Sequence, residues 1–377
     1  MVTVVLDSQA GSCGKGKFIG YLAKRDHADV AINNFMSNAG HTYEDDDYGR
    51  VMTQHLPTSI VNMGTQLVIG PGAAITPDIL FNEILKYKDI IGDRIIKVNP
   101  RAVVIADKHR ETEKQILRSG STFKGCGAAQ ADKVMRQAQL FGEYWENVLK
   151  INEHICDTCD EDYAYIKSHI KVMDTMQYIN DSIDHGQYIL IEGSQGCDLD
   201  INYGLPYPNT TSRQCHAGQL VADCGISPRL VDEIIMIMRP YPIRISNTTN
   251  LQENGKTLMV SSGDYAESKE ITWDIVKERC GAPDNIQFGE MTTVTKKMRR
   301  VFEMNWERLK YVTKLNRPTM IALNFAQYLD WKAYKARYYG DLPAKVLDFI
   351  FQVEEVTGVP VKLIGTGANN EDIIDMR

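Results

Sequence analysis

The sequence predicts an α/β protein, with one large domain whose mainly parallel central sheet is flanked by helices. Short apolar runs recur along the chain, and helical patterns separate them. Strands that alternate with helices form parallel sheets with helices on their faces. The composition agrees, because 43% hydrophobic and 24% charged residues in a chain of 377 are ordinary for a globular protein.

The individual elements follow from the periodicity of the apolar residues. The expected central strands are Val2–Leu6, Gln66–Ile69, Ala102–Ile105, Tyr188–Ile191, Glu233–Met238 and Met320–Leu323. The expected helices include Pro77–Tyr87, Ala131–Lys150 and Ala344–Thr357. There are no repeats or obvious linkers, so we expect residues 1–377 to form a single domain. The polar segment Asn247–Gly289 is expected to be an irregular excursion from it.

Bulk properties argue against several classes of protein. The net charge of −7 disfavours a surface that binds nucleic acid. No apolar run reaches 18 residues, so no membrane span is expected, and the N-terminal run fits a buried strand rather than a signal peptide. Eight cysteines fit reduced thiols in the cytoplasm, or the host cytoplasm if the protein is viral. Cys156 and Cys159 form a lone CxxC, for which two helical thiols are favoured over a zinc site.

A glycine- and lysine-rich turn follows the first expected strand. It reads DSQAGSCGKGK from Asp7 to Lys17, and a helical pattern comes next. A strand, a glycine-rich turn and a helix can form a phosphate cradle, because backbone N–H groups and the helix N-terminus face the anion. Lys15 or Lys17 can neutralise charge that develops during phosphoryl transfer. The turn lacks the Ser or Thr that ends the common P-loop motif, and a merely tight turn is the alternative.

A second loop, Asn38-Ala39-Gly40-His41-Thr42, places a histidine between small residues. A lone histidine is more often structural than catalytic, but its position in this loop favours a functional role. Beside a phosphate, the imidazole can act as a general acid.

Together the two loops resemble those of adenylosuccinate synthetases, which read GDEGKGK and NAGHT. The resemblance continues in order along nearly the whole chain, and six ordered motifs are far more specific than any one of them. The further matching segments are Gly120–Gly127 with Asp132–Val134 and Arg136, Glu192–Gly196, Val294–Val301 and Thr357–Val361. The expected fold is therefore adenylosuccinate synthetase-like.

This resemblance implies a two-step ligation of L-aspartate to C6 of a purine nucleotide. The γ-phosphoryl group of a nucleoside triphosphate first moves to O6 of the purine, which makes a good leaving group. The aspartate amino group then attacks C6, and phosphate departs. Mg²⁺ is the implied cofactor, and a homodimer is the implied assembly.

The resemblance also assigns roles by position. The implied catalytic residues are His41, Ser12, Lys15 and Gln195, and His41 is the acid that stabilises charge on the β,γ-bridge. The implied triphosphate site comprises Gly14, Lys15, Gly16, Lys17, Gly40, His41, Thr42, Asn324, Phe325, Gln327 and Gly367. The implied purine monophosphate site comprises Ser12, Asn38, Ala39, Thr122, Arg136, Gln195, Asn209 and Thr210. The implied aspartate-binding residues are Thr295, Lys297 and Arg299, and the implied magnesium ligands are Ser12 and the Gly40 carbonyl. In the family, the arginine that matches Arg136 reaches across the dimer interface to the nucleotide of the neighbouring subunit.

The first departure from the family pattern is Ser12, which replaces the loop aspartate that removes the N1 proton and helps to bind magnesium. A serine hydroxyl is uncharged and is not an effective base near pH 7 without help. It is also shorter, and the space that it leaves lies near N1 and C2 of the purine. A 2-amino group fits there and can donate a hydrogen bond to Ser12.

The second departure concerns the triphosphate. The family reads the guanine of GTP with the aspartate of a TKLD motif, and Thr313-Lys314-Leu315-Asn316 resembles that motif. The spacing from Arg299-Arg300, however, makes Asn324-Phe325-Ala326-Gln327 its counterpart. Gln327 then replaces a carboxylate that accepts from guanine, and each polar edge left unpaired costs about 1–3 kcal/mol. We therefore expect ATP as the donor, and Phe325 can stack on either base.

Two smaller departures are Lys297 and Asp7. Lys297 replaces an arginine beside the ribose, and the lost fork weakens recognition of the 2′-hydroxyl. Asp7 stands where the family has glycine, and its carboxylate can supply some of the lost base or metal function. The Arg299-Arg300 pair alone would indicate a solvated basic turn, but within the motif the fork of Arg299 suits a carboxylate or phosphate.

A serine in the phosphate loop together with a changed triphosphate motif resembles the viral branch of the family, which makes the 2-aminoadenine precursor for modified DNA. The leading hypothesis is a ligase that joins L-aspartate to C6 of dGMP with ATP, giving N6-succino-2-amino-2′-deoxyadenylate, ADP and phosphate. One alternative is an adenylosuccinate synthetase that acts on IMP with GTP. Another is an inactive purine-nucleotide sensor, which the missing base favours and the retained His41 and Gln195 oppose.

Overall fold

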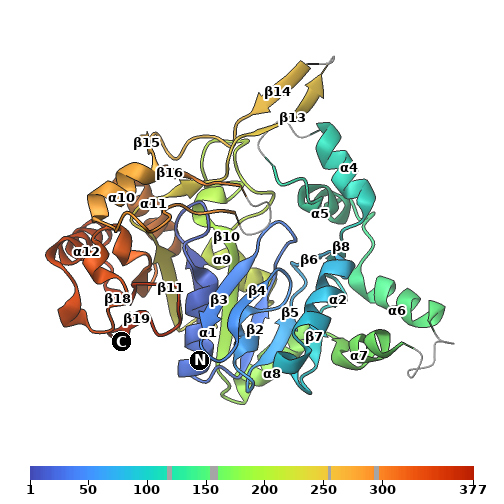
Figure 1. The fold of residues 1–377 in the computed structure, drawn as a ribbon. Coiled ribbons are helices and arrows are strands. Elements are labelled where there is room, and N and C mark those ends of the chain that lie inside the picture. Colours follow the sequence, from blue (N-terminus) through green and yellow to red (C-terminus); the bar gives the residue numbers. More distant parts are fainter. Residues whose placement is uncertain (117–120, 153–159, 254–255, 293–296) are drawn as a thin grey trace.

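In the computed structural model the chain forms an α/β fold on one large twisted sheet (Figure 1). The structure describes residues 1–116, 121–152, 160–253, 256–292 and 297–377. Within these residues ten strands form the sheet, in the order β19 (Ile373–Asp375), β18 (Val361–Gly365), β17 (Met320–Leu323), β11 (Glu233–Met238), β1 (Val2–Asp7), β10 (Ile189–Gly196), β2 (Val30–Asn33), β5 (Gln66–Ile69), β7 (Ile96–Val98) and β9 (Ile170–Val172). Neighbouring strands are parallel except β18 and β19, which confirms the predicted fold class.

Helices cover both faces of the sheet because its central strands are apolar on both sides. All six residues of β1 are buried. Alternate residues of a strand point to opposite faces, so Val4 joins the core beneath α9, α11 and α12, whereas Val5 joins the core beneath α1. The helices are α1 (Lys15–Arg25), α2 (Pro77–Lys86), α3 (Lys88–Ile91), α4 (Asp107–Ile116), α5 (Cys126–Val134), α6 (Phe141–Ile151), α7 (Glu161–His169), α8 (Thr175–Asp184), α9 (Ala217–Asp223), α10 (Trp273–Cys280), α11 (Trp306–Asn316) and α12 (Ala344–Thr357).

Smaller strands lie outside the central sheet. They are β3 (His41–Asp45), β4 (Gly49–Thr53), β6 (Ala74–Ile75), β8 (Val103–Val104), β12 (Ile243–Arg244), β13 (Thr248–Glu253), β14 (Lys256–Val260), β15 (Glu270–Ile271) and β16 (Arg300–Phe302). The β13–β14 hairpin projects from the body of the molecule (Figure 1). The segment Asn247–Gly289, expected to be irregular, thus contains a hairpin, the short strand β15 and the helix α10.

Two sequence predictions are wrong, and both concern the surroundings of β8. The run Ala102–Ile105 was expected in the central sheet, but its strand β8 pairs with β6 in a separate small sheet. The expected helix Ala131–Lys150 is broken into α5 and α6. The break arises because Gln139 accepts a backbone hydrogen bond from Val104, so the residues between the two helices pair with β8 instead of continuing the helix. Arg136 lies in this break with a positive φ of 62°.

Candidate active site

The predicted site residues gather at one edge of the sheet. Asp7 ends β1, Gln195 lies near the end of β10, Asn324–Gln327 follow β17, and Gly367 follows β18. These strands and their neighbours β2 and β11 are parallel, so their carboxyl ends meet at the same edge. Open α/β sheets bind ligands in this position.

Lys15 and Asp7 form a buried ion pair beneath the phosphate loop. Lys15 Nζ lies 2.5 Å from Asp7 Oδ2 and 2.5 Å from the carbonyl oxygen of Gln195. The Cys13 amide also donates to Asp7 Oδ2, whereas Asp7 Oδ1 is buried without a hydrogen-bond partner in the described part of the chain. Asp7 therefore neutralises and orients Lys15. Two of the three ammonium hydrogens are engaged, which leaves one for a phosphate oxygen.

Two glycines let the start of α1 pack closely against its neighbours. Gly14 has a φ of 98°, and a Cβ there would lie 2.0 Å from Asn324 Nδ2. A Cβ at Gly16 would lie 2.6 Å from the carbonyl oxygen of Thr42. Asn324 Nδ2 in turn donates to the carbonyl of Cys13. The absent side chains thus bring three segments of the predicted triphosphate site together.

Lys17 has different partners from Lys15. Its ammonium donates to the carbonyl oxygens of Gly367 and Asp372, both at 2.8 Å. Burial lowers the pKa of Lys17 to about 7, and Asp372 opposes this shift. Lys17 therefore joins α1 to the loop that carries Gly367.

His41 is held by a buried carboxylate. Its Nδ1 lies 2.6 Å from Glu192 Oε1, and the same carboxylate accepts from the backbone N–H and the hydroxyl of Thr58. The imidazole also packs on Phe35, with 4.1 Å between ring centroids. Because an ionised carboxylate only accepts, Nδ1 must carry a hydrogen, and Nε2 remains for a ligand. This is the arrangement of a positioned acid–base group.

Gln195 and Asn38, both predicted to contact the purine monophosphate, lie in contact with each other. Gln195 Nε2 donates to Asn38 Oδ1 at 3.0 Å. Gln195 has a positive φ of 62°, and its own carbonyl receives Lys15. The turn at Gln195 therefore contacts both the loop that carries Asn38 and, through Lys15, the glycine-rich loop after β1.

Arg239 and Glu290 were not predicted from the sequence. Arg239 follows β11 and is fully buried, and both of its terminal nitrogens bond to the Glu290 carboxylate. Arg239 Nη1 also donates to the carbonyl oxygen of Ser12 at 3.0 Å. Burial acts to lower the pKa of Arg239, but Glu290 outweighs it and raises that pKa. A charged residue directly after an apolar strand was a usable signal for Arg239, whereas no sequence pattern connects it to Glu290.

The predicted donor-base residues lie beside Arg239. Its guanidinium lies 4.3 Å from the centroid of the Phe325 ring, which stacks on Tyr328 at 5.3 Å. Gln327 is 7% exposed, and its Oε1 has no hydrogen-bond partner within the described segments. The other segment that resembles the family's TKLD motif, Thr313–Asn316, is structural. Asn316 ends α11, and its side chain accepts a hydrogen bond from the Ala217 amide.

Other predicted residues lie on loops. Thr122 belongs to a loop tied to α4, where the Glu113 carboxylate accepts from the amides of Gly125 and Gly127 at 2.8 and 2.7 Å. Arg136 is exposed. The carbonyl oxygen of Asn209 accepts a hydrogen bond from the Arg244 guanidinium. Thr210, the next residue, is half-buried.

Backbone hydrogen bonds hold Lys297 and Arg299, the two described residues of the predicted aspartate site. The Lys297 amide donates to the Thr292 hydroxyl at 2.9 Å, and the Arg299 amide donates to the carbonyl of Glu290 at 2.8 Å. Burial lowers the pKa of Arg299, and Glu290 opposes that shift. Arg239 and Arg299 share the single carboxylate of Glu290, so one positive charge is in excess here. Thr295, Cys156 and Cys159 lie outside the described residues.

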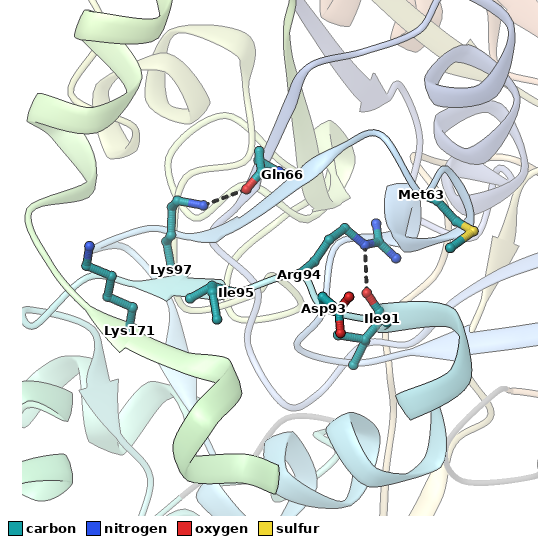
Figure 2. Close-up of a pocket in the computed structure, with 9 residues that line it drawn as sticks. Met63, Gln66, Ile91, Asp93, Arg94, Ile95, Lys97 and Lys171 are labelled. Atoms are coloured by element: carbon teal, nitrogen blue, oxygen red, sulfur yellow. Dashed lines mark hydrogen bonds between the residues drawn. The ribbon is translucent and has the colours of Figure 1, made fainter.

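A separate cavity lies at the other edge of the sheet (Figure 2). It is lined by Gln66 of β5, Lys97 of β7 and Lys171 of β9, close to the amino ends of these strands. Lys97 donates to Gln66 at 2.7 Å, and Arg94 donates to the Ile91 carbonyl at 3.0 Å (Figure 2). No predicted site residue lines this cavity. In the described part of the chain, no helix is long and apolar enough to cross a membrane.

The glycine-rich loop after β1, a histidine held by a buried carboxylate and the loop after β17 meet at the carboxyl ends of a parallel sheet, where open α/β folds bind their ligands. The family model for adenylosuccinate synthetase matches residues 4–331. The N6-succino-2-amino-2′-deoxyadenylate synthase of Salmonella phage PMBT28 is 34% identical over 330 residues, 87% of this chain and 86% of that protein. The adenylosuccinate synthetase of Pyrococcus horikoshii is 30% identical over 380 residues, 99% of this chain and 98% of that protein.

Solved structures show the same fold. The succinoaminodeoxyadenylate synthetase of cyanophage S-2L, bound to dGMP and dATP as an energy donor, aligns with a TM-score of 0.77 and 27% identity, covering 100% of this chain and 95% of that chain. The fully ligated adenylosuccinate synthetase of Plasmodium falciparum aligns with a TM-score of 0.79 at 20% identity, and both chains are covered completely. The chain belongs to the adenylosuccinate synthetase family. It is a carbon–nitrogen ligase of purine nucleotide biosynthesis.

Proposed function

We propose that the enzyme joins L-aspartate to C6 of dGMP with ATP, giving N6-succino-2-amino-2′-deoxyadenylate, ADP and phosphate. The observation that carries the proposal is Ser12, an uncharged residue where the family has a catalytic aspartate. Ser12 has a positive φ of 54° and is half-buried at the tip of the phosphate loop. Its short side chain leaves room for the 2-amino group that distinguishes guanine from hypoxanthine.

The chain's own residues support both steps of the reaction. Lys15, oriented by Asp7, faces the transferred phosphoryl group with its remaining hydrogen. His41 is oriented by Glu192 through Nδ1, and in its protonated form it donates from Nε2 to the developing charge on the β,γ-bridge. Arg299 supplies the excess positive charge for a carboxylate of L-aspartate, whose amino group then attacks C6.

The proposed donor follows from the amide of Gln327. Adenine presents one donor, the 6-amino group, next to one acceptor, N1, and an amide side chain matches this pair. Guanine presents two adjacent donors at N1 and N2, which need two acceptors such as a carboxylate. Gln327 Oε1 is buried and has no hydrogen-bond partner among the described residues, so it is available to the adenine amino group.

Mg²⁺ fits the oxygen donors of this site. Magnesium prefers oxygen ligands and takes several of them from phosphates and water. Ser12 and the Gly40 carbonyl are the proposed protein ligands. Asp7 Oδ1, at the end of β1, is a further buried oxygen without a hydrogen-bond partner among the described residues. In the described residues no cluster of three or more His, Cys, Asp or Glu side chains could hold a metal ion. We propose that phosphate oxygens supply the remaining ligands. When bound, the ion neutralises charge on the triphosphate.

We propose a homodimer in which Arg136 acts in the partner's site. Arg136 is exposed, and the two residues before it, Val134 and Met135, are apolar and 81% and 64% exposed. A subunit interface would cover these side chains.

Arg136→Ala and His41→Ala should each be nearly inactive, but mixed heterodimers should recover part of the activity, because one of their two sites carries neither defect. If the subunits exchange and no activity returns, Arg136 does not act across the interface.

The substrate proposal is tested by comparing kcat/KM for dGMP and IMP, each with L-aspartate and ATP or GTP. We expect a clear preference for dGMP and ATP. A preference for IMP with GTP would indicate an ordinary adenylosuccinate synthetase. Absence of phosphate release with every pair, while nucleotides still bind, would indicate a nucleotide sensor.

A further inference from the structure

Arg239 is the point where three parts of the site meet. Its guanidinium contacts the Phe325 ring at 4.3 Å, the Ser12 carbonyl at 3.0 Å and the Glu290 carboxylate through two nitrogens. Phe325 belongs to the proposed donor-base site and Ser12 to the phosphate loop, and Glu290 precedes the proposed aspartate-binding residues in the chain.

The backbone of Arg239 is fixed independently of its side chain. Gln9 Nε2 donates to the Arg239 carbonyl at 3.0 Å, and the Arg239 amide donates back to Gln9 Oε1 at 3.1 Å. A change at Phe325 or Glu290 must therefore be taken up by the guanidinium and not by a shift of β11.

The environment of Arg239 is poorly suited to stability alone. The side chain is fully buried, and its Nε has no hydrogen-bond partner in the described part of the structure. Burying a guanidinium is costly, and replacing a buried ion pair by packed apolar residues is often neutral or stabilising. The distinctive property of this arginine is its geometry, because a planar fork can bind a carboxylate and stack on a ring at the same time.

We propose that Arg239 is a positioning residue that couples the donor-base site to the aspartate site. A base that stacks on Phe325 fixes the ring against the guanidinium, and the guanidinium then fixes Glu290. The Glu290 carbonyl accepts from the Arg299 amide, and the Glu290 carboxylate interacts electrostatically with both Arg239 and Arg299. Bound triphosphate therefore raises the affinity for L-aspartate, and L-aspartate raises the affinity for triphosphate by the same factor.

The inference rests on the proposed function for the identity of the ligands, but not for the coupling itself. The test measures the affinity for L-aspartate by calorimetry, with and without a non-hydrolysable triphosphate analogue. It is run with the ATP and the GTP analogue, each in the presence of dGMP or IMP. We expect the analogue to strengthen aspartate binding by about 5–150-fold, the usual range of such coupling. If the coupling appears only with the GTP analogue and IMP, the proposed function fails while the inference stands.

In Arg239→Met this coupling factor should fall close to one, whereas each ligand alone should bind within a few-fold of wild type. Arg239→Lys should not restore it, because an ammonium lacks the fork. Arg94→Met is the matched control, since Arg94 is a buried arginine of the separate cavity, and it should leave the coupling unchanged. If Arg239→Met does not fold, Glu290→Gln should also lower the coupling. A wild-type coupling factor in Arg239→Met or, failing that, in Glu290→Gln overturns the inference.

Discussion

The two ends of the candidate site are held in different ways. At the phosphate end, Lys15 and Asp7 lie eight residues apart in one motif, and His41 at the start of β3 meets Glu192 of the central strand β10 across 151 residues. At the other end, Arg239 reaches Glu290 across 51 residues and Ser12 across 227, and the residues that it contacts lie on loops. The phosphate end is thus built into the sheet, whereas the base and aspartate end depends on side-chain contacts between loops.

This difference separates two kinds of effect. Substitutions at the phosphate end should reduce turnover with any substrate, because they remove groups that act on the transferred phosphoryl group. Substitutions at the other end should change which ligands are preferred and how strongly they couple. Ser12 belongs to both ends, since its side chain lies in the phosphate loop and its carbonyl receives Arg239.

The largest expected effect is at His41. His41→Ala should fold and bind nucleotide but lose about 10²–10⁴-fold in kcat, the usual contribution of general acid–base catalysis. Steady-state kinetics and a nucleotide-binding titration test this expectation. Near-wild-type turnover would show that His41 has a structural role, and the phosphate end would then lack its proposed general acid.

A second buried histidine provides the control. His55 receives hydrogen bonds from Ser37 and the Thr76 amide, and burial lowers its pKa to about 3. It is therefore neutral near pH 7, and within the described segments no carboxylate is hydrogen-bonded to its ring. His55→Ala should lower the melting temperature while kcat of the folded enzyme stays within a few-fold of wild type.

An intermediate effect is expected at Gln327. Gln327→Asp restores a second acceptor for guanine, so the ratio of kcat/KM for GTP to that for ATP should rise by about tenfold or more, from about 1–3 kcal/mol for each polar group newly paired. Asn316→Asp is the control, because Asn316 belongs to α11 and should affect stability but not this ratio. If wild type already uses GTP tenfold better than ATP, the assignment of Gln327 to the donor base is wrong.

The sequence predicted the parts of the molecule that depend on local pattern. Strands β5, β11 and β17 and helix α12 have the expected bounds, because each coincides with a distinct apolar run or helical pattern. Strands of similar length, β2, β7, β9 and β18, were missed, because periodicity alone does not show which short runs form strands. The phosphate loop and His41 were found through motifs, whereas the Arg239–Glu290 pair depends on a contact that only folding creates.

The smallest expected effect distinguishes the two lysines of the phosphate end. Lys15 is neutralised by Asp7, whereas the hydrogen-bond partners of Lys17 are carbonyls. Burial lowers the pKa of Lys17 from 10.5 in the unfolded chain to about 7 in the folded one. Between these values the unfolded chain binds more protons, so this group makes stability rise with pH. Below pH 7 both states are protonated, and the slope from this group disappears.

Lys17→Met keeps the length of the side chain and removes the titration. The free energy of unfolding in urea, measured from pH 7.5 to 9.5, should rise more steeply in wild type than in the variant, by at most about 1.4 kcal/mol per pH unit. The variant should also be less stable overall, because two buried carbonyls lose their donor, but that loss alone does not change the slope. Equal slopes would mean that Lys17 keeps an ordinary pKa. Lys15 and Lys17 would then differ in their hydrogen-bond partners but not in the charge that they carry near pH 7.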